Sequence, residues 1–204
     1  MIDKEVLKDS LHFRHACKVF DENKKIAQED LEFILEAGRL SPSSFGMEHW
    51  RFVVVQDAKL KIAMRPLCWN QQQITTCSDL IVIVSKTNKV VSQEYSNAMF
   101  MRRGLTVEHF ENYITRYTNF THQLSSIKEW SLKQCYLAAA NMMSYGAMVG
   151  IDSCPIEGFE KEPLEELLGI GHDEDIALLV PFGYRINPQT PKFRLSFEEI
   201  VEYR

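Results

Sequence analysis

The sequence has no apolar run long enough to span a membrane. Its longest apolar-rich stretch, residues 136–151, is interrupted by Asn141, Ser144 and Gly146, whereas a spanning helix needs about 20 predominantly apolar residues. The N-terminus also lacks the basic and apolar segments of a signal peptide. We therefore expect a cytoplasmic protein without a membrane partner.

Cysteine occurs in a pattern that excludes its usual structural uses. The cysteines are widely spaced and none belongs to a C-x-x-C pair: Cys17, Cys68, Cys77, Cys135 and Cys154. An odd number of cysteines without an export signal argues against a disulfide framework. The lack of close cysteine or histidine pairs also excludes a recognisable zinc site, so we expect no metal.

Several motifs that define large function classes are missing. The sequence contains no G-x-G-x-x-G, no Walker motif, no H-E-x-x-H and no G-x-S-x-G. These absences exclude the standard dinucleotide-binding and nucleotide-binding motifs, the zinc peptidases and the common serine hydrolases. The net charge of −5 comes without a basic stripe, so we expect no nucleic-acid partner.

The order of apolar patterns predicts an α+β protein. Helices are expected at about 3–14, 28–40, 57–65, 126–149 and 161–168, and strands at 51–55, 79–84 and 177–184. The polar residues 87–124 are interpreted as a helical excursion from a single domain that spans residues 1–204.

Two strands carry further information about the sheet. The nearly continuous apolar run at 79–84 is typical of a parallel or mixed sheet with both faces covered. Pro181, inside the strand at 177–184, predicts that this strand lies at an edge or contains a bulge, because proline cannot donate a ladder hydrogen bond.

Two short segments carry cations that suit a phosphate group. Arg14 and Lys18 follow the first helix, and Lys192 and Arg194 lie in the C-terminal tail. Arginine binds phosphate through two parallel hydrogen bonds, and lysine binds it as a point charge. The alternative is that these are surface cations, some of which complement the dipole of a helix C-terminus.

Two polar loops complete the set of candidate binding segments. The hydroxyls of residues 41–44 and the backbone around Gly158 are suited to a polar ligand, since glycine permits close backbone approach. The alternatives are an ordinary helix-to-strand loop and a plain turn.

Together and in this order, these segments resemble the FMN-dependent nitroreductase family, and most of all the oxygen-insensitive NAD(P)H nitroreductases of bacteria. The similarity runs from about residue 10 to residue 203. It is carried by RHACKVFD at 14–21, RLSPSS at 39–44 with WRF at 50–52, Asn70, GIDSCPIEGF at 150–159, GYR at 183–185 and PKFR at 191–194.

The resemblance implies a nitroreductase-like fold with a central mixed β-sheet surrounded by helices. It also implies an intertwined homodimer with FMN bound at each end of the subunit interface. The implied activity is hydride transfer from NAD(P)H to nitroaromatics, quinones or related small acceptors in a ping-pong cycle. No protein nucleophile is needed, because the chemistry belongs to the flavin.

The resemblance also assigns roles to individual residues. Arg14, Lys192 and Arg194 would hold the FMN phosphate, while His15, Ala16 and Lys18 would line the flavin and ribityl chain. Asn70 and Gln73 would lie at the pyrimidine edge, and Pro42, Ser43 and Ser44 would reach the flavin from the other subunit. In the segment Pro155, Ile156, Glu157 and Gly158, the Glu157 amide would donate toward flavin N5.

Some positions depart from the family pattern or remain open. Gln73 stands where many relatives carry a lysine, and His49 replaces a common proline. Cys154 is either a buried structural thiol or a flavin neighbour. Aromatic residues of the excursion either stack on acceptors or form core: Phe100, Phe110, Tyr113, Tyr117 and Phe120. Rival functions are a non-catalytic flavin-binding redox sensor and a structural homodimer.

Overall fold

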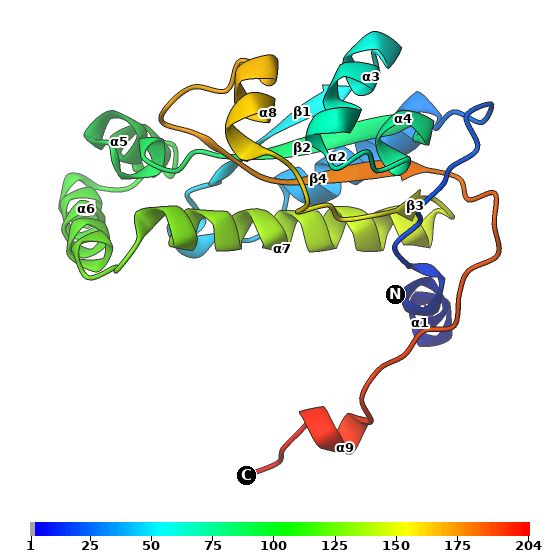
Figure 1. The fold of residues 1–204 in the computed structure, drawn as a ribbon. Helices are drawn as coiled ribbons and strands as arrows, with labels where there is room; N and C mark the ends of the chain where they lie inside the picture. The colour runs from blue at the N-terminus through cyan, green and yellow to red at the C-terminus, as the bar shows by residue number, and fades with distance from the viewer. Residues whose placement is uncertain (1–2) are drawn as a thin grey trace.

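The computed structural model describes residues 3–204. Its α-helices are α1 (Lys4–Phe13), α2 (Gln28–Arg39), α3 (Ala58–Leu67), α4 (Gln73–Thr76), α5 (Gln93–Met101), α6 (Val107–His122), α7 (Ile127–Met148), α8 (Lys161–Leu168) and α9 (Phe197–Ile200). The strands are β1 (Trp50–Val55), β2 (Asp79–Ser85), β3 (Asp152–Ser153) and β4 (Asp175–Gly183), and the short 3-10 helices are η1 (Ser44–Gly46) and η2 (Lys89–Val91). The α+β class is therefore confirmed (Figure 1).

Local signals explain where several of these helices begin and end. The Asp57 carboxylate accepts the Leu60 N–H at the start of α3, and the Ser126 hydroxyl accepts the Glu129 N–H at the start of α7. Gly150 follows α7 with a φ of 77°, a conformation that favours glycine after a helix.

The sheet has four strands in the order β1-β2-β4-β3, and each neighbouring pair is antiparallel. We expected a mixed sheet. Among residues 3–204 the parallel component is limited to an isolated bridge between Ala16 and Ser153. The apolar run at 79–84 reflected burial on both faces, and burial does not fix strand direction.

Helices cover both faces of the sheet, with α7 and α2 on one side and α3 and α8 on the other (Figure 1). Alternate residues of β2 enter different cores. Leu80, Val82 and Val84 pack with α3, α4 and α8, whereas Ile81 and Ile83 pack with α2 and α7. The strand period of two thus accounts for the continuous apolar run.

The strand that contains Pro181 does carry a bulge, as predicted, but Pro181 does not lie at it. Pro181 faces Leu80 in the interior of the sheet, whereas the extra residue of the bulge is Ala177, opposite the step from Ile83 to Val84. The Pro181 carbonyl accepts the Cys154 N–H on the β3 side. The missing N–H of Pro181 points to that same side, so the β2 ladder loses no hydrogen bond.

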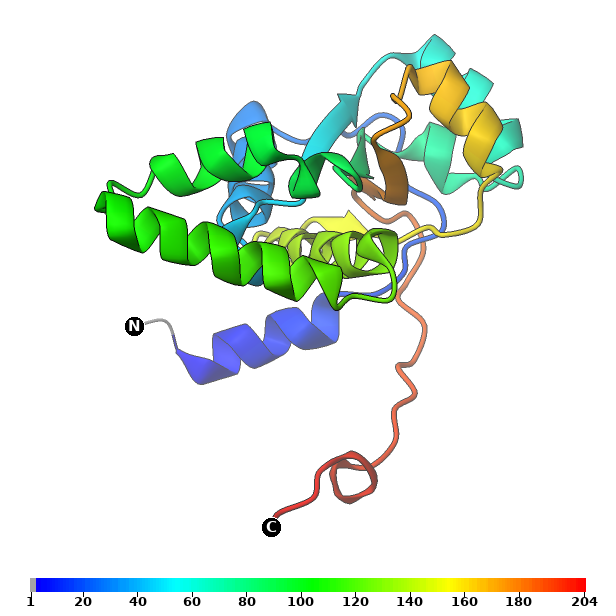
Figure 2. The same cartoon turned by 90° about the vertical axis from the view of Figure 1, so that its left-hand side faces the viewer.

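The expected excursion is helical, and α5 and α6 lie side by side at one end of the molecule (Figure 2). Its apolar side chains form a third core cluster with the loop before β1 and the first turn of α7. Phe100 and Tyr117 are buried there, whereas Phe110, Tyr113 and Phe120 are half-buried.

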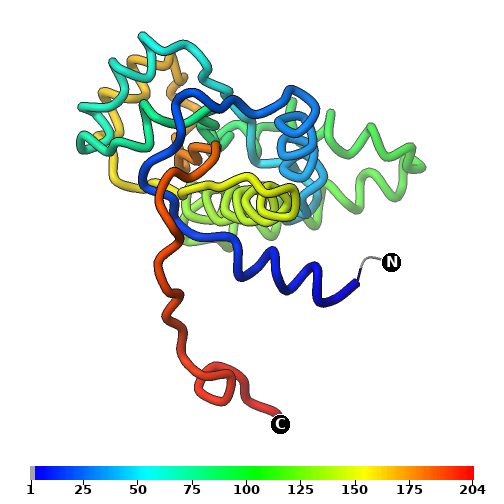
Figure 3. The backbone as a smooth tube through the Cα atoms, turned by 90° about the vertical axis from the view of Figure 1, so that its right-hand side faces the viewer, coloured from blue at the N-terminus to red at the C-terminus, as the bar shows by residue number. Residues whose placement is uncertain are grey.

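After β4 the chain leaves the body as an extended arm that carries α9 (Figures 1 and 3). The arm is rich in exposed apolar side chains: Phe193 and Tyr203 are 84% and 86% exposed, and Leu195, Phe197 and Ile200 are also exposed. Across residues 3–204, the helices are all too short or too polar to cross a bilayer.

Candidate functional site

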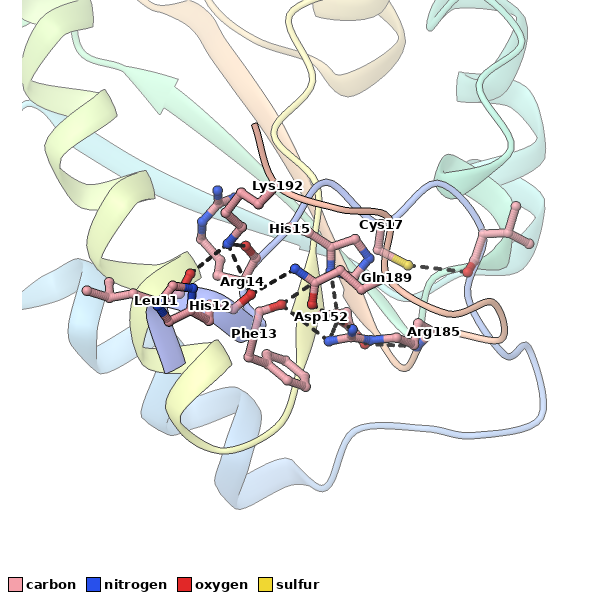
Figure 4. Close-up of polar contacts among 11 residues, drawn as sticks. Leu11, His12, Phe13, Arg14, His15, Cys17, Asp152, Arg185, Gln189 and Lys192 are labelled. Carbon is pink, nitrogen blue, oxygen red and sulfur yellow. Dashed lines mark hydrogen bonds and ion pairs between the residues drawn. The ribbon is translucent and has the colours of Figure 1, made fainter. Parts of the chain in front are cut away.

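The segment after α1 and the segment after β4 meet beside β3. The Cys17 N–H donates to the Ser153 carbonyl at 3.1 Å. The Gln189 amide donates to the His12 carbonyl at 2.8 Å. Two regions almost 180 residues apart in the chain are therefore neighbours in space (Figure 4).

The predicted phosphate-binding cations line one cleft of about 440 Å³. Its walls are Arg14, His15, Ala16, Pro155, Thr190, Pro191, Lys192, Phe193 and Arg194. Burial lowers the pKa of Lys192, and the neighbouring positive charges of Arg14 and Arg194 lower it further. Lys192 is thus close enough to Arg14 and to Arg194 to be repelled by both, which favours an anion beside these cations.

Lys192 also hydrogen-bonds to carbonyl groups at the C-terminal end of α1. Its ammonium donates to the Leu11 carbonyl at 2.7 Å, to the His12 carbonyl at 3.1 Å and to the Arg14 carbonyl (Figure 4). An ammonium has three N–H donors, so these contacts occupy all of them. Lys192 therefore lies as the alternative of a cation at a helix C-terminus describes. Because its donors are occupied, the two arginines are better placed to give directional hydrogen bonds to an anion.

An ion pair between the buried Asp152 and the half-buried Arg185, next to this cleft, was not predicted from the sequence. Arg185 contacts the Asp152 carboxylate at 2.7 Å and donates to the Phe13 carbonyl at 3.3 Å. His15 lies 3.4 Å from the same carboxylate. The pKa of His15 is lowered by burial and by Arg185, against the opposing effect of Asp152. The pair fixes the cationic segment to the ends of β3 and β4 (Figure 4).

A second cleft, of about 410 Å³, adjoins the first along residues 15–19. On this stretch Lys18 places its ammonium 3.4 Å from the Cys154 sulfur, and Gln73 places its amide nitrogen 3.9 Å from it. Burial raises the pKa of the Cys154 thiol, and Lys18 opposes this shift. Cys154 is fully buried, as the structural alternative predicted.

The segment Pro155–Gly158 is held by backbone hydrogen bonds to β4. Ile156 exchanges two backbone hydrogen bonds with Leu179 and is buried, so its side chain belongs to the core. Pro155 and Glu157 are exposed. Within residues 3–204, no backbone hydrogen bond outside helices and strands uses the Glu157 N–H as its donor. The amide predicted to face flavin N5 is thus available.

Gly158 was expected to allow a ligand to approach the backbone closely, but the group next to it in the structure is a side chain of this protein. A Cβ at Gly158 would lie 2.5 Å from the Trp69 ring. Trp69 is 64% exposed and its indole N–H donates to Glu160 at 2.8 Å. The glycine therefore admits an aromatic ring of this chain. Asn70 follows with a φ of 56°, exposed beside this loop.

The loop of Pro42, Ser43 and Ser44 lines neither of these two clefts. Its predicted role in reaching a flavin from the other subunit remains a prediction. The excursion aromatics are also outside both clefts. The burial of Phe100 and Tyr117 agrees with the core alternative, and stacking on acceptors remains a prediction for the half-buried rings.

Comparison with known proteins identifies the family of this chain. Residues 11–184 match the model of the nitroreductase family. YfkO of Bacillus subtilis, named as an NAD(P)H nitroreductase by inference, is 38% identical over 98% of both chains. An inferred NAD(P)H:FMN oxidoreductase of Staphylococcus epidermidis has a TM-score of 0.85, with 25% identity over 97% of this chain and 95% of that chain. An inferred nitroreductase of Exiguobacterium sibiricum, solved with FMN, has a TM-score of 0.83, with 26% identity over 100% and 98%. The chain therefore belongs to the nitroreductase family.

Proposed function

We propose that this protein is an FMN-dependent oxidoreductase that carries hydride from NAD(P)H to nitroaromatics, quinones or related small electron-poor acceptors. The observation that carries the proposal is the convergence of Arg14, Lys192 and Arg194 on one cleft. The FMN bound to the related Exiguobacterium protein supports the choice of anion.

The donor set fits a phosphate monoester. Arg14 and Arg194 would give it charge-assisted hydrogen bonds, and Lys192 would add a point charge while bracing α1. The pKa of Lys192 is lowered first by burial and then by the positive charges of Arg14 and Arg194. A bound dianion would offset the repulsion between Lys192 and these arginines.

The rest of the site would orient the flavin ring. Bound FMN would supply hydride transfer at its N5 atom. Lys18 would place positive charge at the pyrimidine edge, held by the Cys154 sulfur. The exposed Glu157 amide would donate toward N5, and Asn70 would bind the ring edge. NAD(P)H and the acceptor would use the same open face of the flavin in turn, and one site that serves two substrates in turn gives ping-pong kinetics.

The proposal includes a homodimer. Large apolar side chains of the arm, including Phe193, Leu195 and Tyr203, are exposed on a single chain. On α7, Tyr136, Leu137 and Tyr145 are also exposed. Exposed apolar groups gathered in this way mark interaction surfaces. A second copy of the chain would cover both sets, with each arm lying across the partner.

The decisive experiment is anaerobic reduction of the FMN-loaded protein. We expect NADH or NADPH to bleach the flavin absorption, and a nitroaromatic or quinone to restore it at a rate that depends on acceptor concentration. Stopped-flow reduction with each nucleotide separately would also determine which one is preferred.

Three outcomes would contradict the proposal at different levels. A protein that acquires no flavin absorption when mixed with FMN would favour a structural role. A flavin that is not bleached by either nucleotide, or one that is bleached but regains its colour no faster with any acceptor, would favour a flavin-binding sensor.

A further inference from the structure

The loop between α2 and β1 has a backbone conformation that side chains rarely adopt. Phe45 and Glu48 have φ angles of 53° and 47°, and Gly46 between them has a φ of 60°. A non-glycine residue in this region costs about 1–3 kcal/mol. Such a conformation persists only where the surrounding structure imposes it.

Side chains from the segment after β2 hold this loop by its carbonyl groups. Arg103 donates to the Phe45 carbonyl, and Lys86 donates to the Glu48 carbonyl at 3.1 Å. The Tyr95 hydroxyl lies 2.9 Å from the Met47 carbonyl and 3.2 Å from the Glu48 carbonyl, and it donates to this pair. Lys86 also donates to the Tyr95 hydroxyl at 2.9 Å. The Tyr95 hydroxyl is therefore at the centre of this set of hydrogen bonds, which we call the carbonyl clamp.

The apolar side of the loop is part of the excursion core. The Phe45 ring lies 5.3 Å from the Tyr117 ring and 5.2 Å from the Phe120 ring. Met47 is fully buried in the same cluster. The loop cannot move without exposing these side chains, so α5 and α6 constrain it through both apolar packing and hydrogen bonds.

The constrained backbone carries Ser43 and Ser44. The Ser44 N–H donates to Gln134 at 2.9 Å, and the Ser43 hydroxyl accepts the Glu48 N–H at 2.9 Å. These two serines are the ones predicted to reach the flavin of the other subunit. Their positions thus depend on the same loop conformation that the excursion imposes.

We propose that Tyr95 is a positioning residue that, with Lys86 and Arg103, holds residues 43–48 in the conformation that binds FMN across the subunit interface. The inference rests on the proposed function. In this proposal the excursion acts by holding the loop, and its own side chains need not contact a substrate.

The test compares Tyr95→Phe with Tyr117→Phe. Both changes remove one hydroxyl near the same aromatic cluster, but the Tyr117 hydroxyl donates to the Val90 carbonyl at 2.8 Å, away from the loop. In the flavin-free protein we expect amide hydrogen exchange of residues 44–48 to be about tenfold faster in Tyr95→Phe, the size of a lost hydrogen-bond pair. Tyr117→Phe should leave it unchanged.

The same variants are then titrated with FMN. We expect Tyr95→Phe to weaken FMN binding by about tenfold, because the loop loses the hydrogen bond that sets its resting conformation, and Tyr117→Phe to bind as the unsubstituted protein does. Arg103→Gln, on an exposed side chain, should act in the same direction as Tyr95→Phe and provides the result if Tyr95→Phe does not fold.

Unchanged exchange in both Tyr95→Phe and Arg103→Gln would overturn the carbonyl clamp. Faster exchange with unaltered FMN affinity would overturn its role in flavin binding. A failure of the unsubstituted protein to bind FMN would instead overturn the proposed function, while the exchange comparison would still test the clamp by itself.

Discussion

At the residue scale, Gln73 is predicted to lie at the pyrimidine edge of the flavin. It is 3% exposed and its amide nitrogen lies near both Gln71 and the Cys154 sulfur. We predict that Gln73→Lys raises the midpoint potential of bound FMN, because a second cation beside Lys18 stabilises the reduced, anionic form. A shift of about 30 mV corresponds to about 1.4 kcal/mol for a two-electron couple.

An anaerobic redox titration measures this shift. Gln72→Lys is the matched control, since Gln72 is exposed on the neighbouring position and should leave the potential unchanged. Equal potentials for the unsubstituted protein and Gln73→Lys would remove residue 73 from the surroundings of the flavin.

We predict that His49 makes the stability of the protein depend on pH. It is fully buried, its Nδ1 lies 3.1 Å from the Ser131 hydroxyl, and burial lowers its pKa to about 4 from an ordinary value of 6.5. Between these two values the unfolded chain binds a proton that the folded chain does not. The free energy of unfolding therefore falls as the pH drops through this window, by about 3 kcal/mol at most, and the loss ends below it.

Urea unfolding at about pH 7 and about pH 4.5 measures this effect. We expect His49→Gln to lose less stability between these pH values than the unsubstituted protein loses. His109→Gln, on an exposed position, is the control and should behave as the unsubstituted protein. An identical pH dependence in His49→Gln would show that His49 is not the group responsible.

Residue types and order were sufficient to predict which cations gather, but not what each one contacts. Arg14, Lys192 and Arg194 do line one cleft. The use of the Lys192 ammonium by α1 carbonyls depends on the path of the tail, which has no local sequence signal. The Asp152–Arg185 pair was missed for the same reason, because its members are 33 residues apart.

At the element scale, the Asp152–Arg185 pair joins the end of α1 to β3 and β4. Asp152 is 3% exposed, and its carboxylate accepts both the backbone and the side-chain N–H of Arg185. We predict that Asp152→Asn lowers the free energy of unfolding by about 3 kcal/mol, because it leaves the Arg185 charge unpaired. Denaturant unfolding provides the measurement.

Glu174→Gln is the matched control for Asp152→Asn. It breaks an ion pair with Arg51, whose side chain is 38% exposed, so the loss should be about 1 kcal/mol or less. Equal losses in the two variants would contradict the special role of the buried pair.

Elements with long periodic patterns were predictable, and very short ones were not. The helix at 126–149 and the strand at 79–84 appear within about one residue of their expected bounds. β3 has two residues and α4 has four, too few to show a period. Strand direction was also beyond the local pattern, and the mixed sheet is therefore corrected to an antiparallel one.

At the scale of the whole molecule, the arm is the feature that a single chain leaves unexplained. We predict that removal of residues 195–204, which keeps Lys192 and Arg194, converts a dimer into a monomer and weakens FMN binding. The physical reason is the loss of the exposed apolar groups that a second copy would cover. Light scattering measures the mass, and a truncated chain that remains dimeric would contradict the prediction.

The central claim is that the Arg14, Lys192 and Arg194 cluster recognises the phosphate of a bound flavin. The most direct measurement compares the affinity of the protein for FMN and for riboflavin, which lacks the phosphate, by fluorescence titration. We predict that FMN binds at least about tenfold tighter, as expected for charge-assisted hydrogen bonds, and that Arg194→Ala reduces this ratio. Equal affinities for FMN and riboflavin in the unsubstituted protein would contradict the account.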